Sequence, residues 1–471
     1  MASLLRLPGE QLSMDAEEYV RRRIGSGVSD DQICQGLRDH VIRIKGVSQE
    51  HAGAFARAVI EEVRYTLDLS GDLFRYQPAG VRMGEFGVGS RGTGDFFAHR
   101  QIARIIGKTA ASVGVDEMDD AGAVRLAPAA TGPFAENPFI VCTVDGMHSR
   151  LSDYPFLAGF HVTRATLRDV YVMGARPIML FSDIHVADDG DVAKIFDYTA
   201  GITAVGEMMD VPLVTGSTLR IGGDMVLGAR MTGCVGAVGV ANHLTARKGT
   251  RPGDVILMTE GAGGGTIATA AIYSGYPGVV EHTINLHFLQ ACEALLASDV
   301  LPRIHAMTDV TNGGLRGDVY EIAETARCRI VIREDQVAGL VQQDVFRMLE
   351  VLHIDYLGVS LDALMIIAPP DATGEIVRII RSAGVDIREI GRVEAGEPEA
   401  VLESGGQQHA FSPRFRESAY TPVKKVVDRD ARDFKEMKRG VRQAADAAIA
   451  KKERVKERLK KVEQANIAKS G

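Results

Sequence analysis

Cysteines are few in this 471-residue chain, and none lie close together along the sequence. They form no Cys-x-x-Cys pair and make an odd total: Cys34, Cys142, Cys234, Cys292 and Cys328. This spacing argues against a disulfide framework and against a zinc site built from thiolates.

Long apolar runs and a general excess of positive charge are also missing. No uninterrupted apolar stretch approaches the roughly 18 residues of a membrane-spanning helix, and the N-terminus does not resemble a signal peptide. The formal charge of −8 and the isoelectric point near 5.9 argue against a general affinity for nucleic acid or anionic membranes. We therefore expect a soluble, cytoplasmic protein.

The charge is nevertheless uneven along the chain. Residues 421–471 contain 16 Lys and Arg against 8 Asp and Glu, so this segment carries +8 and the remainder −16. From residue 428 onward most residues are strong helix formers. The pattern predicts a basic helical tail over 421–471. We expect it to lie along the body or a partner subunit; the less favoured alternative is an RNA-binding element.

The first 80 residues show three helical patterns, over 14–27, 29–46 and 48–69. Ser29 is the expected N-cap of the second helix, and Gly46 is its expected stop. No titratable cluster stands out among them. We expect residues 1–80 to form a helical extension that serves packing or docking, and a protein partner is a candidate ligand for it.

Between residues 83 and 405, short β-branched runs alternate with helical patterns. In the first half "PFIVCTV" (138–144), "IMLFSDIHV" (178–186) and "VPLVTG" (211–216) read as strands, and "AGFHVTRATLRDVYVMGARP" (158–177) reads as a helix. The alternation restarts after a boundary near 242–252. This predicts an α/β (α+β) fold with one domain over 83–242 and a second over 250–405.

The stretch "MGEFGVGSRGTGDFF" (83–97) contains Gly87-x-Gly89-x-x-Gly92 and ends with Asp95 and two aromatics. A dinucleotide fingerprint requires a buried strand before the glycines, and none is evident. A phosphate-binding loop of the Gly-x-x-x-x-Gly-Lys kind fails as well, because "EGAGGGT" (260–266) has no following lysine. Two interpretations remain open: an amide-rich segment that folds over an anion, and a plain surface linker.

Carboxylates at the ends of predicted elements are more informative. Each one alone is most often a cap or turn residue, but together they favour a site for Mg²⁺, which carboxylate oxygens and waters hold. The acids are Asp119, Asp120, Asp145, Asp169 and Asp309. Two predicted turns, "TGST" (215–218) and "TNGG" (311–314), add backbone N–H donors for an anion. The histidines show no metal-ligand spacing, and we interpret them as structural: His148, His161, His185 and His305.

Six segments together resemble the superfamily of aminoimidazole ribonucleotide (AIR) synthase (PurM-like), which includes selenophosphate synthetase, thiamine-monophosphate kinase and the hydrogenase-maturation carbamoyl dehydratase (HypE). They are "DDAGAV" (119–124), "CTVDG" (142–146), "LRDVYVMGARPIML" (167–180), "VTGST" (214–218), "GDVILMT" (253–259) and "IHAMTDVTNGGL" (304–315). The resemblance implies an AIR-synthase-like fold whose N-terminal domain binds ATP and pairs across a homodimer.

The resemblance also implies residue roles. Metal-bound ATP would be held by Asp119, Asp120, Asp145 and Asp169, with a contribution from Asp309, and Asp145 and Asp309 would be catalytic. The stretch 84–94 is similar to a lid over the site. Further nucleotide contacts would come from the lid, from the two predicted turns and from two acids outside them: Gly87, Gly89, Gly92, Gly216, Thr218, Thr311, Gly313 and Gly314, with Asp95 and Asp120.

Several positions depart from the family pattern. Arg168 stands where an Asn is frequent, Ser217 stands where an acid is frequent, and Arg150 is the nearest candidate for a basic residue expected soon after Asp145-Gly146. The glycine stretch has no Cys, which argues against selenophosphate synthesis. The resemblance implies a Mg-ATP-dependent enzyme that phosphorylates or dehydrates a small amide or carbonyl substrate. The alternative is an ATP-binding regulatory or scaffold protein without catalysis.

Overall fold

The structure, a computed structural model, describes residues 15–74, 80, 101–103, 105–109, 139–187, 190–221, 229–311, 313–414, 420–427, 454, 456–462 and 464. The chain divides into two compact units, Met1–Lys424 and Lys425–Gly471. Within the described residues, no helix is long and apolar enough to cross a membrane.

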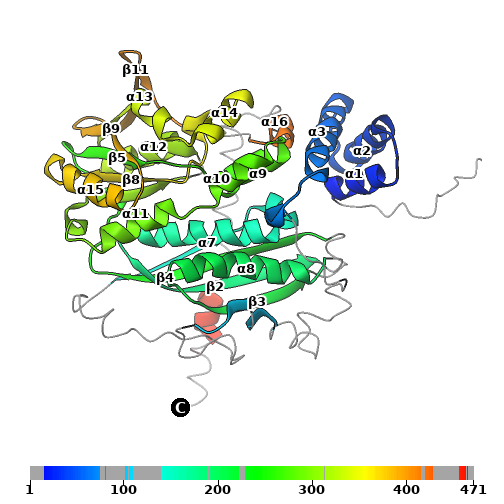
Figure 1. The fold of residues 1–471 in the computed structure, drawn as a ribbon, viewed down its shortest axis with the longest axis horizontal. Coiled ribbons are helices and arrows are strands. Elements are labelled where there is room, and N and C mark those ends of the chain that lie inside the picture. Colours follow the sequence, from blue (N-terminus) through cyan, green and yellow to red (C-terminus); the bar gives the residue numbers. More distant parts are fainter. Residues whose placement is uncertain are drawn as a thin grey trace, which may run out of the picture. The chain divides into compact units, whose positions relative to one another are not determined.

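Three helices open the first unit, as the sequence predicts: α1 (Ala16–Gly25), α2 (Asp30–Lys45) and α3 (Gln49–Leu67) (Figure 1). Ser29 is the N-cap residue of α2, but its hydroxyl donates to Gln32 instead of capping the backbone. Gly46 ends α2 in the left-handed conformation that glycine favours, at φ 63°. The helices share a small core of their own, centred on Ile33, Val59 and other buried apolar residues.

The first α/β domain is built on a four-stranded sheet in the order β1-β4-β2-β3. Its strands are β1 (Phe139–Gly146), β2 (Arg176–Ala187), β3 (Leu213–Ile221) and β4 (Met231–Ala241). Only β2 and β3 are parallel to each other. Helices α7 (Pro155–Tyr171) and α8 (Ala193–Met208) lie side by side across the sheet (Figure 1).

The second α/β domain contains a seven-stranded mixed sheet in the order β11-β10-β7-β9-β5-β8-β6. The strands are β5 (Val255–Thr259), β6 (Ala306–Val310), β7 (Arg329–Arg333), β8 (Ala363–Ala368), β9 (Ile387–Glu394), β10 (Glu399–Ser404) and β11 (Gln407–Ala410). The helices are α9 (Gly265–Tyr273), α10 (Pro277–Thr283), α11 (His287–Leu296), α12 (Gly314–Ala326), α13 (Glu334–Val337), α14 (Gln343–Val351) and α15 (Pro370–Ser382). Helix α16 (Pro422–Val427) follows this domain.

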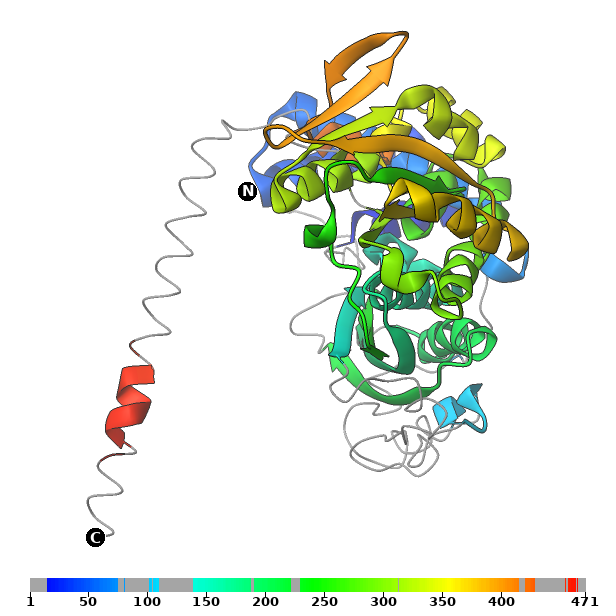
Figure 2. The same ribbon diagram turned by 90° about the vertical axis from the view of Figure 1, so that its left-hand side faces the viewer.

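Strands β1 and β2 lie where the sequence predicts them, and β5 to β9 follow the alternation that is predicted to restart after the boundary near 242–252. The β10–β11 hairpin has no counterpart in the prediction, because β11 is exposed along its whole length and carries the polar sequence "QQHA". This hairpin projects from the edge of the second sheet (Figure 2). The structure therefore has two mixed α/β domains that follow the N-terminal helices.

Buried ion pairs join the N-terminal helices to the first domain. Arg150, in the 3-10 helix Ser149–Asp153, contacts Glu17 of α1 at 2.5 Å and also contacts Glu62 of α3. Its guanidinium lies 3.9 Å from the ring centroid of Tyr273 in α9. The carboxylate of Glu62 also accepts a hydrogen bond of 2.6 Å from the backbone of Val423. Glu62 thus ties the helices to the body and to the segment that follows the second domain.

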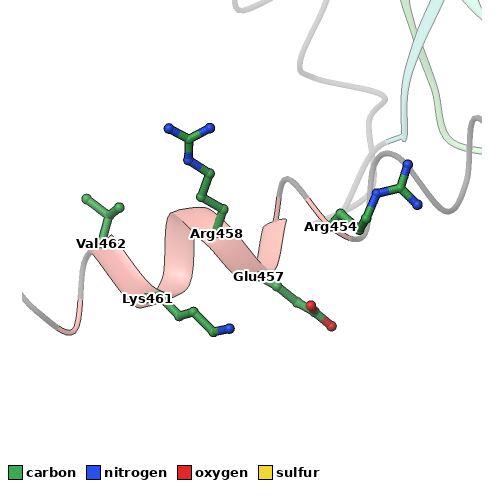
Figure 3. Close-up of a pocket in the computed structure, with 5 residues that line it drawn as sticks. All are labelled: Arg454, Glu457, Arg458, Lys461 and Val462. Atoms are coloured by element: carbon green, nitrogen blue, oxygen red, sulfur yellow. The ribbon is translucent and has the colours of Figure 1, made fainter.

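The described residues of the second unit, 454, 456–462 and 464, are helical. Arg454, Glu457, Arg458, Lys461 and Val462 border a shallow hollow on this helix (Figure 3). In Figure 3, Arg458 and Val462 lie on one side of the helix while Glu457 and Lys461 point away from them. The hollow is thus a surface feature of one helix, and among the described residues no second element encloses it.

Candidate functional site

A cavity of about 480 Å³ lies where the two α/β domains meet. Its walls come from β1, the end of α7, the linker around the 3-10 helix Arg247–Gly249, β6 and α12. The lining residues are Val141, Cys142, Thr143, Asp169, Val172, Met173, Ala246, Arg247, Lys248, Met307, Thr308, Asp309 and Thr325. Two of the predicted acids, Asp169 and Asp309, therefore line one cavity although 140 positions separate them in the sequence.

Asp169 is a polar residue near the end of the mostly buried helix α7. The hydroxyl of Thr143 on β1 donates a hydrogen bond of 3.1 Å to its carboxylate. Burial, followed by the negative charges of Asp309 and Asp145, raises the pKa of Asp169 to about 7, although Arg168 and the hydrogen bond from Thr143 lower it. The neutral form of Asp169 is therefore well populated near neutral pH.

Asp145 lies within β1, one residue before its end, and pairs with Val235 of β4. The sequence predicts a sharp turn at this acid, but the strand continues through Gly146 because the pairing with β4 extends to Cys234. Asp145 projects from the same face of β1 as Thr143, two residues earlier. Burial raises its pKa, Arg168 lowers it and Asp309 raises it. The same charges thus act on Asp145 and Asp169.

Asp309 lies within β6 and is only 8% exposed. Its carboxylate lies 3.2 Å from the guanidinium of Arg168 on α7. The neighbouring Asp318 of α12 has a pKa well above its usual range, because it is buried and repelled by Asp309. Asp318 accepts a hydrogen bond of 3.3 Å from the backbone of Thr311 and pairs with Arg247 at 3.1 Å.

Two arginines of α7 contact the second domain. Arg164 and Arg168, one turn apart, both contact the carboxylate of Asp362, which lies just before β8. Arg164 also donates to the backbone carbonyls of Thr283 and Asn285 at 2.7 Å, and to Gly263 at 2.8 Å. These contacts fix α7 of the first domain against the second domain.

Gly216 and Thr218 are not in a turn, which corrects the prediction for "TGST". Strand β3 continues through Ile221, because Gly216 pairs with Ser182 and Thr218 with Ile184 of β2. β3 and β1 form opposite edges of the sheet, with β4 and β2 between them. At about 4.8 Å per strand, the two edges are some 14 Å apart. The described cavity therefore does not include these two residues.

The predicted turn at "TNGG" does precede a helix. Gly313 and Gly314 have φ of 95° and 62°, so both need the left-handed region that glycine tolerates. A Cβ on Gly314 would lie 2.5 Å from backbone atoms of Leu357 and Gly358, a contact too close to be accommodated. Backbone geometry and close packing therefore explain both glycines without a ligand, and Thr311 bonds to Asp318.

The remaining predicted residues lie outside the described part of the chain: Gly87, Gly89, Gly92, Asp95, Asp119 and Asp120. Among the described residues no group of three His, Cys, Asp or Glu side chains is close enough to hold a metal ion. The five-acid metal site hence stays a prediction. Its described members, Asp145, Asp169 and Asp309, are oxygen donors, which is the donor chemistry that suits Mg²⁺, and the charge of Asp309 raises the pKa of both Asp145 and Asp169.

The four histidines each contact a polar neighbour. His305 lies 2.9 Å from Asp254 and His185 lies 2.8 Å from Asp183. His148 and His161 each lie 3.3 Å from a threonine hydroxyl, and burial lowers their pKa to about 4 and about 3, respectively. His148 and His161 are therefore neutral at physiological pH.

The sequence analysis did not identify Arg164, Arg247 and Lys248 as residues of this region, and it named Arg168 only as a departure from the family pattern. Two features of the sequence could have indicated these residues. One is the pair of arginines, Arg164 and Arg168, four positions apart in an apolar helix. The other is the basic pair Arg247-Lys248 in a linker of an acidic chain. Arg150, the candidate cation near Asp145, is instead committed to Glu17 and Glu62. Its guanidinium serves the N-terminal helices, not the cavity.

Comparison with known proteins identifies the family. Residues 118–241 match the family model "AIR synthase related protein, N-terminal domain", and residues 251–403 match the corresponding C-terminal domain. The chain belongs to the AIR synthase-related family. The resemblance in the sequence is thereby confirmed, as is the two-domain fold.

Two related proteins and one solved structure show what this chain is similar to. An uncharacterized protein of Methanocaldococcus jannaschii is 50% identical over 460 residues, covering 95% of this chain and 98% of that one. A selenide, water dikinase of Myxococcus xanthus is 28% identical, covering 61% and 86%. A crystal structure of the hydrogenase maturation protein HypE in complex with ATP superposes with a TM-score of 0.58 at 20% identity, covering 72% and 99%. At this identity the superposition establishes the fold.

Proposed function

We propose that this chain is a Mg-ATP-dependent enzyme that transfers the γ-phosphoryl group to an oxygen of a small amide or carbonyl substrate. The phosphorylated substrate would be the product, or it would lose that oxygen as inorganic phosphate, which completes a dehydration. The family assignment supports ATP as the cofactor, because the related HypE has been crystallised with ATP and another relative is a dikinase. We assign the nucleotide to the domain over 83–242.

The observation that carries the proposal is the electrostatics of Asp145 and Asp169. Both carboxyls have raised pKa values although Arg168 is nearby, since burial and the negative charge of Asp309 outweigh that cation. Buried carboxyls with raised pKa values mark a candidate site at which a further cation would neutralise them. When bound, Mg²⁺ would screen the phosphate charge and polarise the terminal phosphoryl group.

The chain's own residues would position the reactants. Lys248 lines the cavity and is exposed, and within the described part of the chain it has no ion pair, so its ammonium can meet a phosphate. Asp145 and Asp309 are the proposed catalytic acids. Asp169 is held by Thr143, which fixes its carboxylate toward the cavity. Such catalysis consists of positioning and charge neutralisation.

We further propose a homodimer formed through the first sheet. Among the described strands β1 lies at an edge of this sheet, and its apolar side chains Phe139, Ile140 and Val144 are 49%, 73% and 60% exposed. Alternate residues of a strand share a face, so Ile140 and Val144 form one apolar surface. A second copy of the chain docked against this surface would remove its apolar side chains from water. Nucleotide contacts from Gly216, Thr218 and the stretch 84–94 remain predictions within this arrangement.

The alternative is an ATP-binding regulatory protein without catalysis. The pairing of Arg168 with Asp309 favours it, because one of the two proposed catalytic acids is engaged by a cation of the protein itself. Binding of ATP without turnover on any of the substrates below would support this alternative.

Turnover tests the leading proposal. ADP release would be measured with Mg²⁺, ATP and a set of small carboxamides and carboxylates, using the full chain. We expect one class of substrate to accelerate ADP release, and Asp145→Ala and Asp309→Ala to abolish the acceleration. Asp371→Ala, at an exposed carboxylate of α15, is the matched control. Unchanged turnover in both the Asp145→Ala and the Asp309→Ala variant would refute the assignment.

A further inference from the structure

Four charged side chains form a closed group between the two domains. Arg164 and Arg168 both contact Asp362, and Arg168 also reaches Asp309 at 3.2 Å. All four are at least 92% buried, with exposed fractions of 1%, 7%, 6% and 8% for Arg164, Arg168, Asp362 and Asp309. Two guanidinium charges thus balance two carboxylate charges, and the group is neutral as a whole.

The backbone holds both carboxylates of this group in place. Asp362 has a φ of 59°, a conformation that side-chain-bearing residues rarely adopt, and its N–H donates to the carbonyl of Val310 at 3.0 Å. Asp309 pairs with Leu364 of β8 within the sheet. Asp309 and Asp362 are therefore fixed beside each other by the β6–β8 pairing, and Arg168 bridges them from α7.

Asp145 and Asp169 lie outside this neutral group. No ion pair within 4.0 Å is found for either carboxylate among the described residues; the hydroxyl of Thr143 is the described partner of Asp169. The three acids therefore fall into two classes. Asp309 forms an ion pair with a guanidinium, whereas Asp145 and Asp169 feel the charge of Arg168 without forming an ion pair.

We propose that Arg168 is a resident counter-cation that takes the place of a divalent ion at Asp309, so that a metal ion binds through Asp145 and Asp169 without Asp309. A divalent ion bound to a carboxylate lies roughly 2.0–2.6 Å from the oxygen. On Asp309 it would lie within about 6 Å of the Arg168 guanidinium in a buried setting, where like charges repel strongly. This proposal rests on the proposed function, and it removes Asp309 from the metal ligands of that function.

Manganese binding by the nucleotide-free, full-length protein tests this proposal. Free Mn²⁺ gives an electron paramagnetic resonance signal that is lost on binding, so affinity and stoichiometry follow from a titration. We expect Asp309→Asn to bind Mn²⁺ within about twofold of the wild type, and Asp169→Asn to bind it at least about tenfold more weakly. A tenfold loss in Asp309→Asn, or no binding by the wild type, would overturn the proposal.

Variants of Arg168 test whether its charge keeps a metal ion away from Asp309. Arg168→Met exposes Asp309 to metal, so we expect an additional Mn²⁺ ion per chain, or about tenfold tighter binding. Arg168→Lys keeps the charge and should match the wild type. The double variant Arg168→Met/Asp309→Asn removes both charges and should lose the gain. A gain that persists in the double variant, or no gain in a folded Arg168→Met protein, would contradict the proposal.

The Asp309→Asn comparison decides the question even if the Arg168→Met protein fails to fold. In Asp309→Asn, Arg168 is still present and still pairs with Asp362. ATP binding, measured separately by calorimetry, keeps the two hypotheses apart. If ATP does not bind, the proposed function fails, whereas the Mn²⁺ comparison still decides the role of Arg168.

Discussion

The guanidinium of Arg150 contacts the carboxylate of Glu62, a side chain of the N-terminal helices with no exposed surface. Replacing Arg150 with Met would leave this buried carboxylate without its cation. We expect Arg150→Met to lower the free energy of unfolding by about 3–5 kcal/mol at pH 7.5, the usual cost of an uncompensated buried charge. Chemical denaturation measures it, with the exposed Arg347→Met as control.

The same variant should show a defined pH dependence. Burial raises the pKa of Glu62 to about 6, although Arg150 lowers it. Without Arg150 the pKa rises further, so Glu62 takes up a proton at a higher pH and no longer carries an uncompensated charge. The loss of stability should therefore be smaller at pH 5 than at pH 7.5. An equal loss at both pH values would show that the charge of Glu62 is not the cause.

Asp169 should make the ligand-free protein less stable as the pH rises. Its pKa is raised to about 7, so the folded state holds a proton that the unfolded state releases near pH 4. Stability from this group is present below about pH 4 and is lost as the pH rises to about 7. Linkage gives at most about 4 kcal/mol, and partial exposure reduces it. Asp169→Asn should flatten this part of the stability curve, whereas Asp371→Asn should not.

Lys248 should matter for nucleotide binding and not for stability. Its side chain is exposed and lines the cavity beside Asp169 and Asp309. Loss of one charge-assisted contact to a phosphate typically costs about 1.5–3 kcal/mol, so we expect Lys248→Met to weaken ATP binding roughly 10- to 100-fold. Arg251→Met, in the same linker but not part of the cavity, should bind normally. Equal affinities for the two variants would exclude Lys248 as a phosphate contact.

The proposed dimer can be tested on β1. Val144→Asp places a charge in the apolar surface, so we expect sedimentation to report a monomer at concentrations where the wild type is a dimer. Val351 of α14 has a similar exposed fraction, 61%, and Val351→Asp serves as the control. If the wild type sediments as a monomer, or if the β1 variant still forms the dimer, this surface is not the interface.

Much of the fold could be predicted because local patterns and tertiary structure agree. The ends of α2 follow from Ser29 and Gly46, and the strand β8 is a continuous apolar run. The β10–β11 hairpin could not be predicted, since its exposed polar residues carry no burial pattern. "TGST" was misassigned to a turn, because the glycine signal is local and the pairing of β3 with β2 is not.

The site was partly predictable for the same reason. Asp145, Asp169 and Asp309 can be recognised at element ends or within apolar elements, and the structure brings their charges within reach of one another. The partner of Asp309 could not be deduced, because Arg168 reaches it across the domain boundary. Asp362 likewise acquires its role only when β8 pairs with β6.

Calorimetric titration with a non-hydrolysable ATP analogue, with and without Mg²⁺, tests the central claim most directly. The wild type should bind the analogue with Mg²⁺ and much more weakly without it, and Asp145→Asn and Asp169→Asn should each lose this metal dependence. Metal-independent binding in all three proteins, or no binding by the wild type, would contradict the claim that these carboxylates hold a metal-bound nucleotide.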